Sequence, residues 1–193
     1  MDQLLEEIEN YIRILFREHC DESFFFHNLS HTQKVVSRTI EIAEQIKLSP
    51  DDTFKAMAAA WFHDAGYLFV HPSLHEEKST EVMLEFMAGK SDDSVLAEIA
   101  GCIMATKYPT NPESLLQQII CDADTYHFGT NEFIESNEKV FLEFRMKIPG
   151  LDRERFNEGT VSMLLHHQFY TEYCTTLLDA GKQRNIDRLL LNY

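Results

Sequence analysis

The sequence predicts a single all-α domain. Apolar residues recur at helical spacing over almost the whole chain, and the alternating patterns typical of strands are nearly absent. The chain holds only 7 Gly and 5 Pro, and its 193 residues are enough for one domain with a sizeable core but short for two. We therefore expect residues 1–193 to form one compact multi-helix bundle.

Four helices are expected in the N-terminal half, over residues 2–20, 30–46, 49–64 and 75–87. Ser30, with a glutamine three residues later, has the spacing of a capping box, which places His31 in the first turn of its helix. Ser49 before Pro50 is a strong helix start, because serine caps well and proline suits the first turn. The aromatic stretch 21–28 is expected to be non-helical and to tuck inward.

Further helices are expected in the C-terminal half, over residues 91–106, 111–127, 131–146, 152–167 and 171–192. Ser91 is the expected cap of the first of these helices. Asn111 and Pro112 are expected to begin the second, and Gly129 to follow its end. The loop 147–150 separates the next two helices.

Charge and cysteine usage narrow the classes of partner and compartment. The formal net charge is −15 and the pI about 4.9, so the surface repels nucleic-acid polymers and anionic lipid. An anionic substrate can enter only where a pocket is locally positive, as a bound metal would make it. No signal peptide is recognised, and the longest apolar run, 56–62, is too short to span a bilayer. The four cysteines lack paired spacing, which predicts a reducing, cytoplasmic setting.

The residues that carry chemistry are histidines and aspartates at helix ends. His63-Asp64 follows an apolar helix, and chance alone supplies about half of one such pair in this composition. The pair gains weight from His31 upstream and Asp124 downstream. If their helices pack side by side, two nitrogens and two carboxylates converge, a set that suits Mn, Fe, Co, Ni or Zn. Each residue also has a simpler explanation that needs no metal. His31 is an ordinary polar residue at a helix N-terminus, His63 is a histidine buried in the core, and Asp124 is an acid on the surface.

Five blocks along the chain together look like the HD superfamily of metal-dependent phosphohydrolases: Phe26-His27-Asn28-Leu29-Ser30-His31-Thr32, Phe62-His63-Asp64-Ala65-Gly66-Tyr67, His75-Glu76-Glu77-Lys78-Ser79, Ile103-Met104-Ala105-Thr106-Lys107 and Cys121-Asp122-Ala123-Asp124. The match covers roughly residues 24–129 and leaves 130–193 as additional C-terminal helices. Within that part, the stretch 166–171 also resembles one bacterial branch of the superfamily. The ordered blocks are specific for the superfamily but not for a substrate.

The resemblance implies a metal site made of His31, His63, Asp64 and Asp124. Asp124 is preferred to Asp122 as the ligand, because Ala123-Asp124 matches the Ala-Asp register usual in the superfamily. Three neighbouring residues are expected to support the ligands or to contact substrate: His75, Glu76 and Asp122.

Two further residues have roles implied by the same resemblance. Binuclear members carry a second additional histidine where this chain has Thr106-Lys107, so we expect about one metal ion per chain and a contact between Lys107 and a substrate phosphate. His27 matches the histidine that protonates the leaving group in class I cyclic-nucleotide phosphodiesterases. An alternative role for His27 is a hydrogen bond to a carboxylate that supports the site.

The expected function is therefore metal-dependent hydrolysis of a phosphoester in a small nucleotide-like substrate, with Mn, Fe, Ni, Co or Zn, and with Mg also compatible. One alternative is a nucleotide-sensing HD module with little or no turnover. A di-iron HD oxygenase is a second alternative, against which the missing second histidine argues. The alarmone-hydrolysing branch carries acidic residues soon after its His-Asp pair, where this chain has Ala65-Gly66-Tyr67, so that substrate is set aside.

Overall fold

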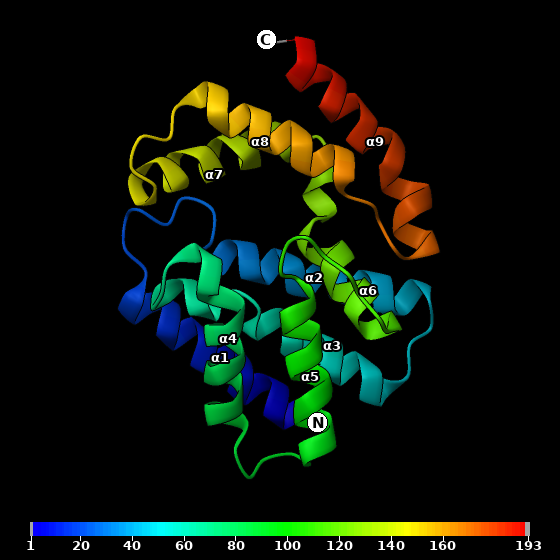
Figure 1. The fold of residues 1–193 in the computed structure, drawn as a ribbon. Helices are drawn as coiled ribbons and strands as arrows, with labels where there is room; N and C mark the ends of the chain where they lie inside the picture. The colour runs from blue at the N-terminus through cyan, green and yellow to red at the C-terminus, as the bar shows by residue number, and fades with distance from the viewer. Residues whose placement is uncertain (1, 192–193) are drawn as a thin grey trace.

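The structure, a computed structural model, describes residues 2–191 and confirms the all-α fold (Figure 1). Within that range there are nine α-helices and no strand. The helices are α1 (Asp2–His19), α2 (Leu29–Gln45), α3 (Pro50–Phe62), α4 (His75–Met87), α5 (Asp93–Ala105), α6 (Leu115–Asp124), α7 (Phe133–Lys147), α8 (Arg153–His166) and α9 (Glu172–Leu191). Three short 3₁₀ helices connect them: η1 (Ala65–Leu68), η2 (Pro72–Leu74) and η3 (Tyr126–Gly129). The expected end of the last helix, Asn192, lies outside the described residues.

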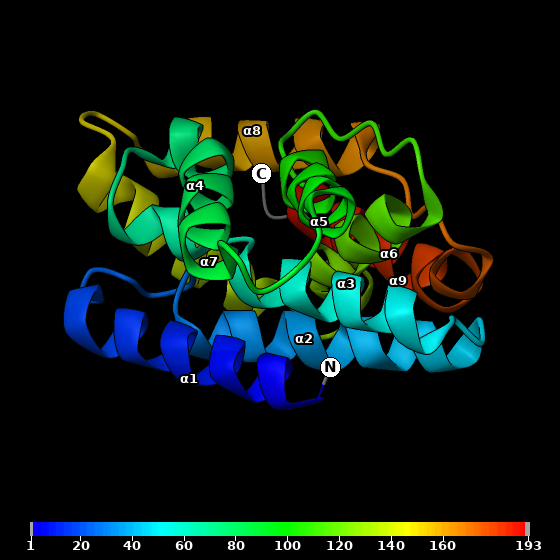
Figure 2. The same ribbon diagram turned by 90° about the horizontal axis from the view of Figure 1, so that it is seen from below.

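Helix α3 is the centre of the molecule. It packs against α1, α2, α5 and α6, and Figure 2 shows it between the layer of α1 and α2 and the layer that holds α5 and α6. Four alanines on α3 are completely buried: Ala56, Ala58, Ala59 and Ala60. Because alanine side chains are short, helices can approach α3 closely from several sides. This crowding brings the ends of three different helices to one point.

Three helix starts differ from those expected. Asn28, and not the Ser30 box, caps α2, because its side-chain oxygen accepts hydrogen bonds from Ser30 N and His31 N. Helix α6 begins after Ser114, whose side chain accepts from Gln117 N, and not at Asn111. Ser91 is not a cap either, since α5 begins one residue later than that assignment requires. Ser49 does cap α3 as expected.

The last three helices form the upper part of the molecule in Figure 1, where α7 and α8 lie across the end of the bundle. Helix α9 is held to the core through η3, where two glycines meet. A Cβ at Gly181 would stand 1.8 Å from the carbonyl oxygen of Gly129, so a side chain does not fit there. No helix in the described part of the chain is both long enough and apolar enough to cross a membrane.

Candidate metal centre and the adjoining cavity

Three helix ends bring His31, His63 and Asp124 together. His31 lies in the first turn of α2, His63 directly follows α3, and Asp124 is the last residue of α6. One potential ligand atom of each residue lies within 4.8 Å of the others, so the group could hold a metal ion. The Nε2 atoms of His31 and His63 are 3.4 Å apart, and Asp124 Oδ1 lies 3.1 Å and 3.6 Å from them. The sequence predicts the convergence of four residues, these three and Asp64, and the structure places these three in one group able to hold a metal.

The hydrogen bonds of the histidines direct their Nε2 atoms into the site. His63 Nδ1 lies 2.8 Å from the carbonyl oxygen of Ala60, which can only accept a hydrogen bond. In the neutral ring the proton therefore sits on Nδ1 and leaves Nε2 as a free ligand atom. His75 has the same arrangement, with Nδ1 2.6 Å from Pro72 O. This is the tautomer in which a histidine binds a metal through Nε2.

Asp64 supplies a carboxylate oxygen that lacks a satisfactory partner. Its Oδ2 is buried and makes no hydrogen bond, although the Nε2 atoms of His31 and His63 lie 3.3 and 3.2 Å away. Its other oxygen, Oδ1, is 3.4 Å from His75 Nε2. A buried carboxylate without a hydrogen bond is costly, and a cation between the imidazoles would satisfy it. The residues present therefore fit a metal ion.

The electrostatics of the cluster favour positive charge at this point. Burial alone would lower the pKa of His63, but the adjacent Asp64 raises it well above its usual value. Burial would likewise raise the pKa of Asp64, but the His63 and His31 imidazoles bring it well below its usual value. The pKa of Asp124 is lowered by the same two histidines against the effect of burial. The two carboxylates thus favour positive charge beside the imidazoles, and a divalent ion held by the Nε2 atoms would supply it.

Glu143 is the functional candidate that the sequence did not reveal. It lies on α7, is fully buried, and sits 2.8 Å from Nδ1 of His27. Its other oxygen accepts hydrogen bonds from Phe26 N and His27 N. Burial raises the pKa of Glu143, but the bond to His27 outweighs it and leaves the pKa at about 2. Glu143 thus stays charged and fixes His27, and the 116-residue separation in sequence leaves no local pattern to detect.

The ring of His27 is also fixed by stacking. The Tyr67 ring lies parallel to it at a centroid distance of 4.0 Å and an angle of 14°. The Phe144 ring is also nearly parallel to it, at 5.9 Å. With Nδ1 occupied by Glu143, Nε2 is the ring nitrogen left for a ligand in the cavity that His27 lines.

Of the three residues expected to support the ligands or contact substrate, two line the cavity and one does not. His75 and Glu76 line the same cavity as Asp64. Asp122 is buried but bound elsewhere: its carboxylate accepts from Tyr170 N and from both the backbone and the hydroxyl of Thr171. These bonds hold the connection between α8 and α9.

Lys107 pairs with Glu77 at the surface. Its side chain is 38% exposed, and Lys107 is not among the residues that line the cavity beside the cluster. A contact between Lys107 and a substrate phosphate would require the pair to separate, and it remains a prediction.

A cavity of about 500 Å³ opens onto the cluster. Asp64, Asp124 and His27 are among the polar residues that line it. Its remaining wall is mainly apolar and is supplied by η1, η3, the α5–α6 connection, α7 and α8. A concave, mostly apolar pocket with a few converging polar groups is the usual form of a small-molecule site.

Comparisons of the chain with family models, with curated proteins and with solved structures found no match. The likeness to an HD domain therefore rests on the motifs and the structure themselves. An all-helical fold that joins His31, His63 and Asp124 into a group able to hold a metal is compatible with such a domain.

Proposed function

We propose that this protein is a metal-dependent phosphohydrolase of the HD type that cleaves a phosphoester in a small, nucleotide-like substrate. The observation that supports this most directly is the buried Oδ2 of Asp64, which faces two imidazole nitrogens without a hydrogen bond, in a residue that lines a cavity. Two nitrogens and two carboxylates form the donor set, contributed by His31, His63, Asp64 and Asp124. This set suits Mn, Fe, Co, Ni or Zn, and Mg²⁺ less well because it prefers oxygen ligands.

A metal ion held there would supply Lewis-acid chemistry, namely activation of water near neutral pH and polarisation of the phosphoryl group. The chain's own contacts constrain two of the four ligand residues. His31 and His63 are almost fully buried, and the backbone carbonyl of Ala60 fixes the ring of His63. Such preorganised ligands lose little freedom when an ion binds.

The chain supplies the proton for the leaving group through His27. When the imidazole carries two protons, Glu143 neutralises its charge at Nδ1, and the Nε2 proton is the one available to the cavity. A leaving alkoxide next to Nε2 takes that proton as the bond to phosphorus breaks. Tyr67 and Phe144 hold the ring plane and shield it from water.

A substrate panel tests the proposal. Purified chain loaded with Mn²⁺ is assayed on phosphomonoesters, cyclic nucleotides and nucleoside phosphates, and we expect release of phosphate or opening of a phosphodiester for at least one class. Asp64→Ala should abolish turnover, because it removes a ligand oxygen and the charge that holds the ion. Asp179→Ala is the matched control, since Asp179 lies on α9 and does not line the cavity.

Calorimetry on the same compounds separates the enzyme from a sensor. Tight binding of a nucleotide with no turnover across the panel would make the protein a nucleotide-sensing module and the proposal wrong. Turnover that survives in Asp64→Ala would show that the reaction does not use this site.

A further inference from the structure

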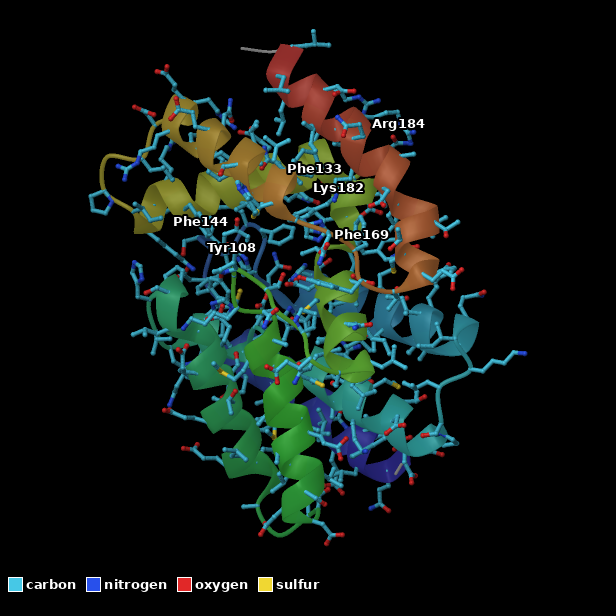
Figure 3. All side chains as sticks on the ribbon, turned by 45° about the vertical axis from the view of Figure 1, so that its right-hand side comes forward. Tyr108, Phe133, Phe144, Phe169, Lys182 and Arg184 are labelled. Atoms are coloured by element: carbon cyan, nitrogen blue, oxygen red, sulfur yellow. The ribbon has the colours of Figure 1, made fainter. Side chains whose placement is uncertain are left out.

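The cavity beside the metal centre extends well beyond the residues that the proposed chemistry uses. Tyr108 reaches it from the connection between α5 and α6, and Phe133 and Phe144 reach it from α7 (Figure 3). Phe128 and Phe156 add aromatic wall from η3 and α8. Flat rings around one cavity favour a flat ring as the occupant, since aromatic groups stack or meet edge to face.

The charges around this cavity limit how many phosphates the occupant carries. Arg155 is the only lysine or arginine among the residues that line it. Glu76 lines it as well, is not one of the proposed ligands, and would repel a second anion away from the metal. A polyphosphate chain normally needs several cationic donors, and Arg155 is the one permanently charged cation in this wall.

One residue of the wall is a glycine that the backbone does not require. Gly159 lies in the middle of α8, where glycine costs about 0.5–1 kcal/mol relative to alanine. A Cβ built there meets no heavy atom within 4 Å, so no close contact excludes a side chain. Its neighbours on the same helical face, Phe156, Thr160 and Met163, all line the cavity. A side chain at 159 would take up cavity space.

We propose that this cavity binds the leaving group of the substrate, that this group is an alkoxide that carries a flat aromatic ring system and is bonded to a single phosphoryl group, and that Gly159 sets the size that fits. The inference rests on the proposed function for the position of the phosphoryl group, which lies at His31, His63, Asp64 and Asp124. Gly159 acts as a specificity-determining residue because its missing side chain leaves room for the ring. Apolar burial supplies the affinity for the ring, and the metal supplies the affinity for the phosphoryl group.

Binding of unreactive phosphonates tests this inference without the need for turnover. The Mn²⁺-loaded chain is titrated by calorimetry with methylphosphonate and with naphthylmethylphosphonate, which share the head group and differ in the ring. We expect the naphthyl compound to bind about tenfold or more tightly, because it alone buries an aromatic surface. Equal affinity for the two compounds, or no binding of either, would overturn the inference.

Variants at position 159 test the role of the glycine. Gly159→Phe should weaken the naphthyl compound about tenfold or more and leave methylphosphonate within roughly twofold. Glu158→Phe is the matched control and should bind both compounds as the wild type does, because Glu158 is exposed on the same helix and does not line the cavity. An unchanged affinity of Gly159→Phe for the naphthyl compound, or an equal loss for both compounds, would refute the role of Gly159. If circular dichroism shows that the phenylalanine variant does not fold, Gly159→Leu replaces it, with the same direction expected.

The outcomes separate this inference from the proposed function. Preference for the naphthyl compound without hydrolysis of any ester would retain the ring site and discard the phosphohydrolase. Hydrolysis of esters without any preference for the ring would retain the phosphohydrolase and discard the ring site.

Discussion

The imidazole of His27 has two different environments on its two nitrogens. Nδ1 faces Glu143, which is buried and charged, while Nε2 is left for the cavity. With Glu143 at Nδ1, a proton on Nε2 is the one that the ring can donate toward the cavity. The same contact also accounts for the alternative role, a hydrogen bond that merely orients His27. The two roles differ in how the rate depends on the leaving group.

His27→Ala should retain metal but lower kcat on a substrate with an alkoxide leaving group by about a hundredfold or more, because positioned proton transfer is lost. A nitrophenyl ester, whose leaving group needs little protonation, should lose much less. Steady-state rates on both esters, with elemental analysis, measure this. His166→Ala is the control, since His166 is exposed and does not line the cavity. Equal losses on the two esters together with reduced metal content would refute the acid role.

Asp122 and Asp124 are two residues apart but have different roles, since Asp124 is a proposed metal ligand and Asp122 accepts buried hydrogen bonds. Asp124→Asn should lower metal occupancy, because it weakens a ligand of the cluster. Asp122→Asn should keep the metal and lower the free energy of unfolding by about 1–3 kcal/mol, because the buried bonds to Tyr170 and Thr171 depend on its carboxylate. Elemental analysis and urea unfolding measure the two effects. Metal loss in Asp122→Asn with full occupancy in Asp124→Asn would show that the ligand assignment is reversed.

At the scale of helices, the same glycine-to-alanine substitution should have opposite effects on stability in the neighbouring helices α8 and α9. Gly181→Ala should destabilise the protein by about 1–3 kcal/mol, because the new Cβ would collide with the backbone of Gly129 where α9 meets η3. Gly159→Ala should stabilise it by about 0.5–1 kcal/mol, because α8 gains helix propensity without a clash. Urea unfolding of both variants tests this pair, and a change of the same sign in both would contradict the packing described here.

The sequence predicted where helices lie better than where they begin. Helical spacing of apolar residues identified the helices, and the Ser49-Pro50 start of α3 was correct because proline restricts the choice locally. At α2, Asn28 and Ser30 are both good caps, and only the three-dimensional path of the preceding segment selects Asn28. For α6, residues 111–113 are not helical, and Ser114 caps the helix in place of the expected start at Asn111.

The metal centre and its surroundings also differ in how much the sequence could reveal. His31, His63 and Asp124 were predictable because each belongs to a short motif at a helix end. Glu143 was not, because an acid on a helix of mixed composition carries no local signal of burial. Its partner, His27, becomes evident only when α7 is placed beside residues 26–27.

For the molecule as a whole, acid stability should depend on His167. Burial and the nearby Lys182 lower the pKa of His167 to about 3, so the unfolded chain binds a proton near pH 6.5 that the folded chain does not. Its contribution to stability is therefore full above pH 6.5 and is lost as the pH falls toward 3.

Between pH 7 and pH 5 the wild type should lose about 1–2 kcal/mol of unfolding free energy relative to His167→Gln, measured by urea unfolding in the presence of a chelator. Asp124 and Asp64 raise the pKa of His31, so the stability that His31 contributes is lost as the pH rises. This effect on the free energy of unfolding is opposite in sign to that of His167. The comparison with the variant is needed to separate the two. Parallel curves for the wild type and the variant over this range would contradict the assignment.

The most direct test of the central claim is the location of a bound ion. A crystal of the protein grown with Mn²⁺ and measured at the manganese edge should show one strong anomalous peak per chain between His31 Nε2, His63 Nε2, Asp64 and Asp124, at about 2.0–2.2 Å from the ligand atoms. A peak of that strength at another place, or none in a crystal that holds Mn²⁺, would contradict the assignment of this cluster as a metal centre.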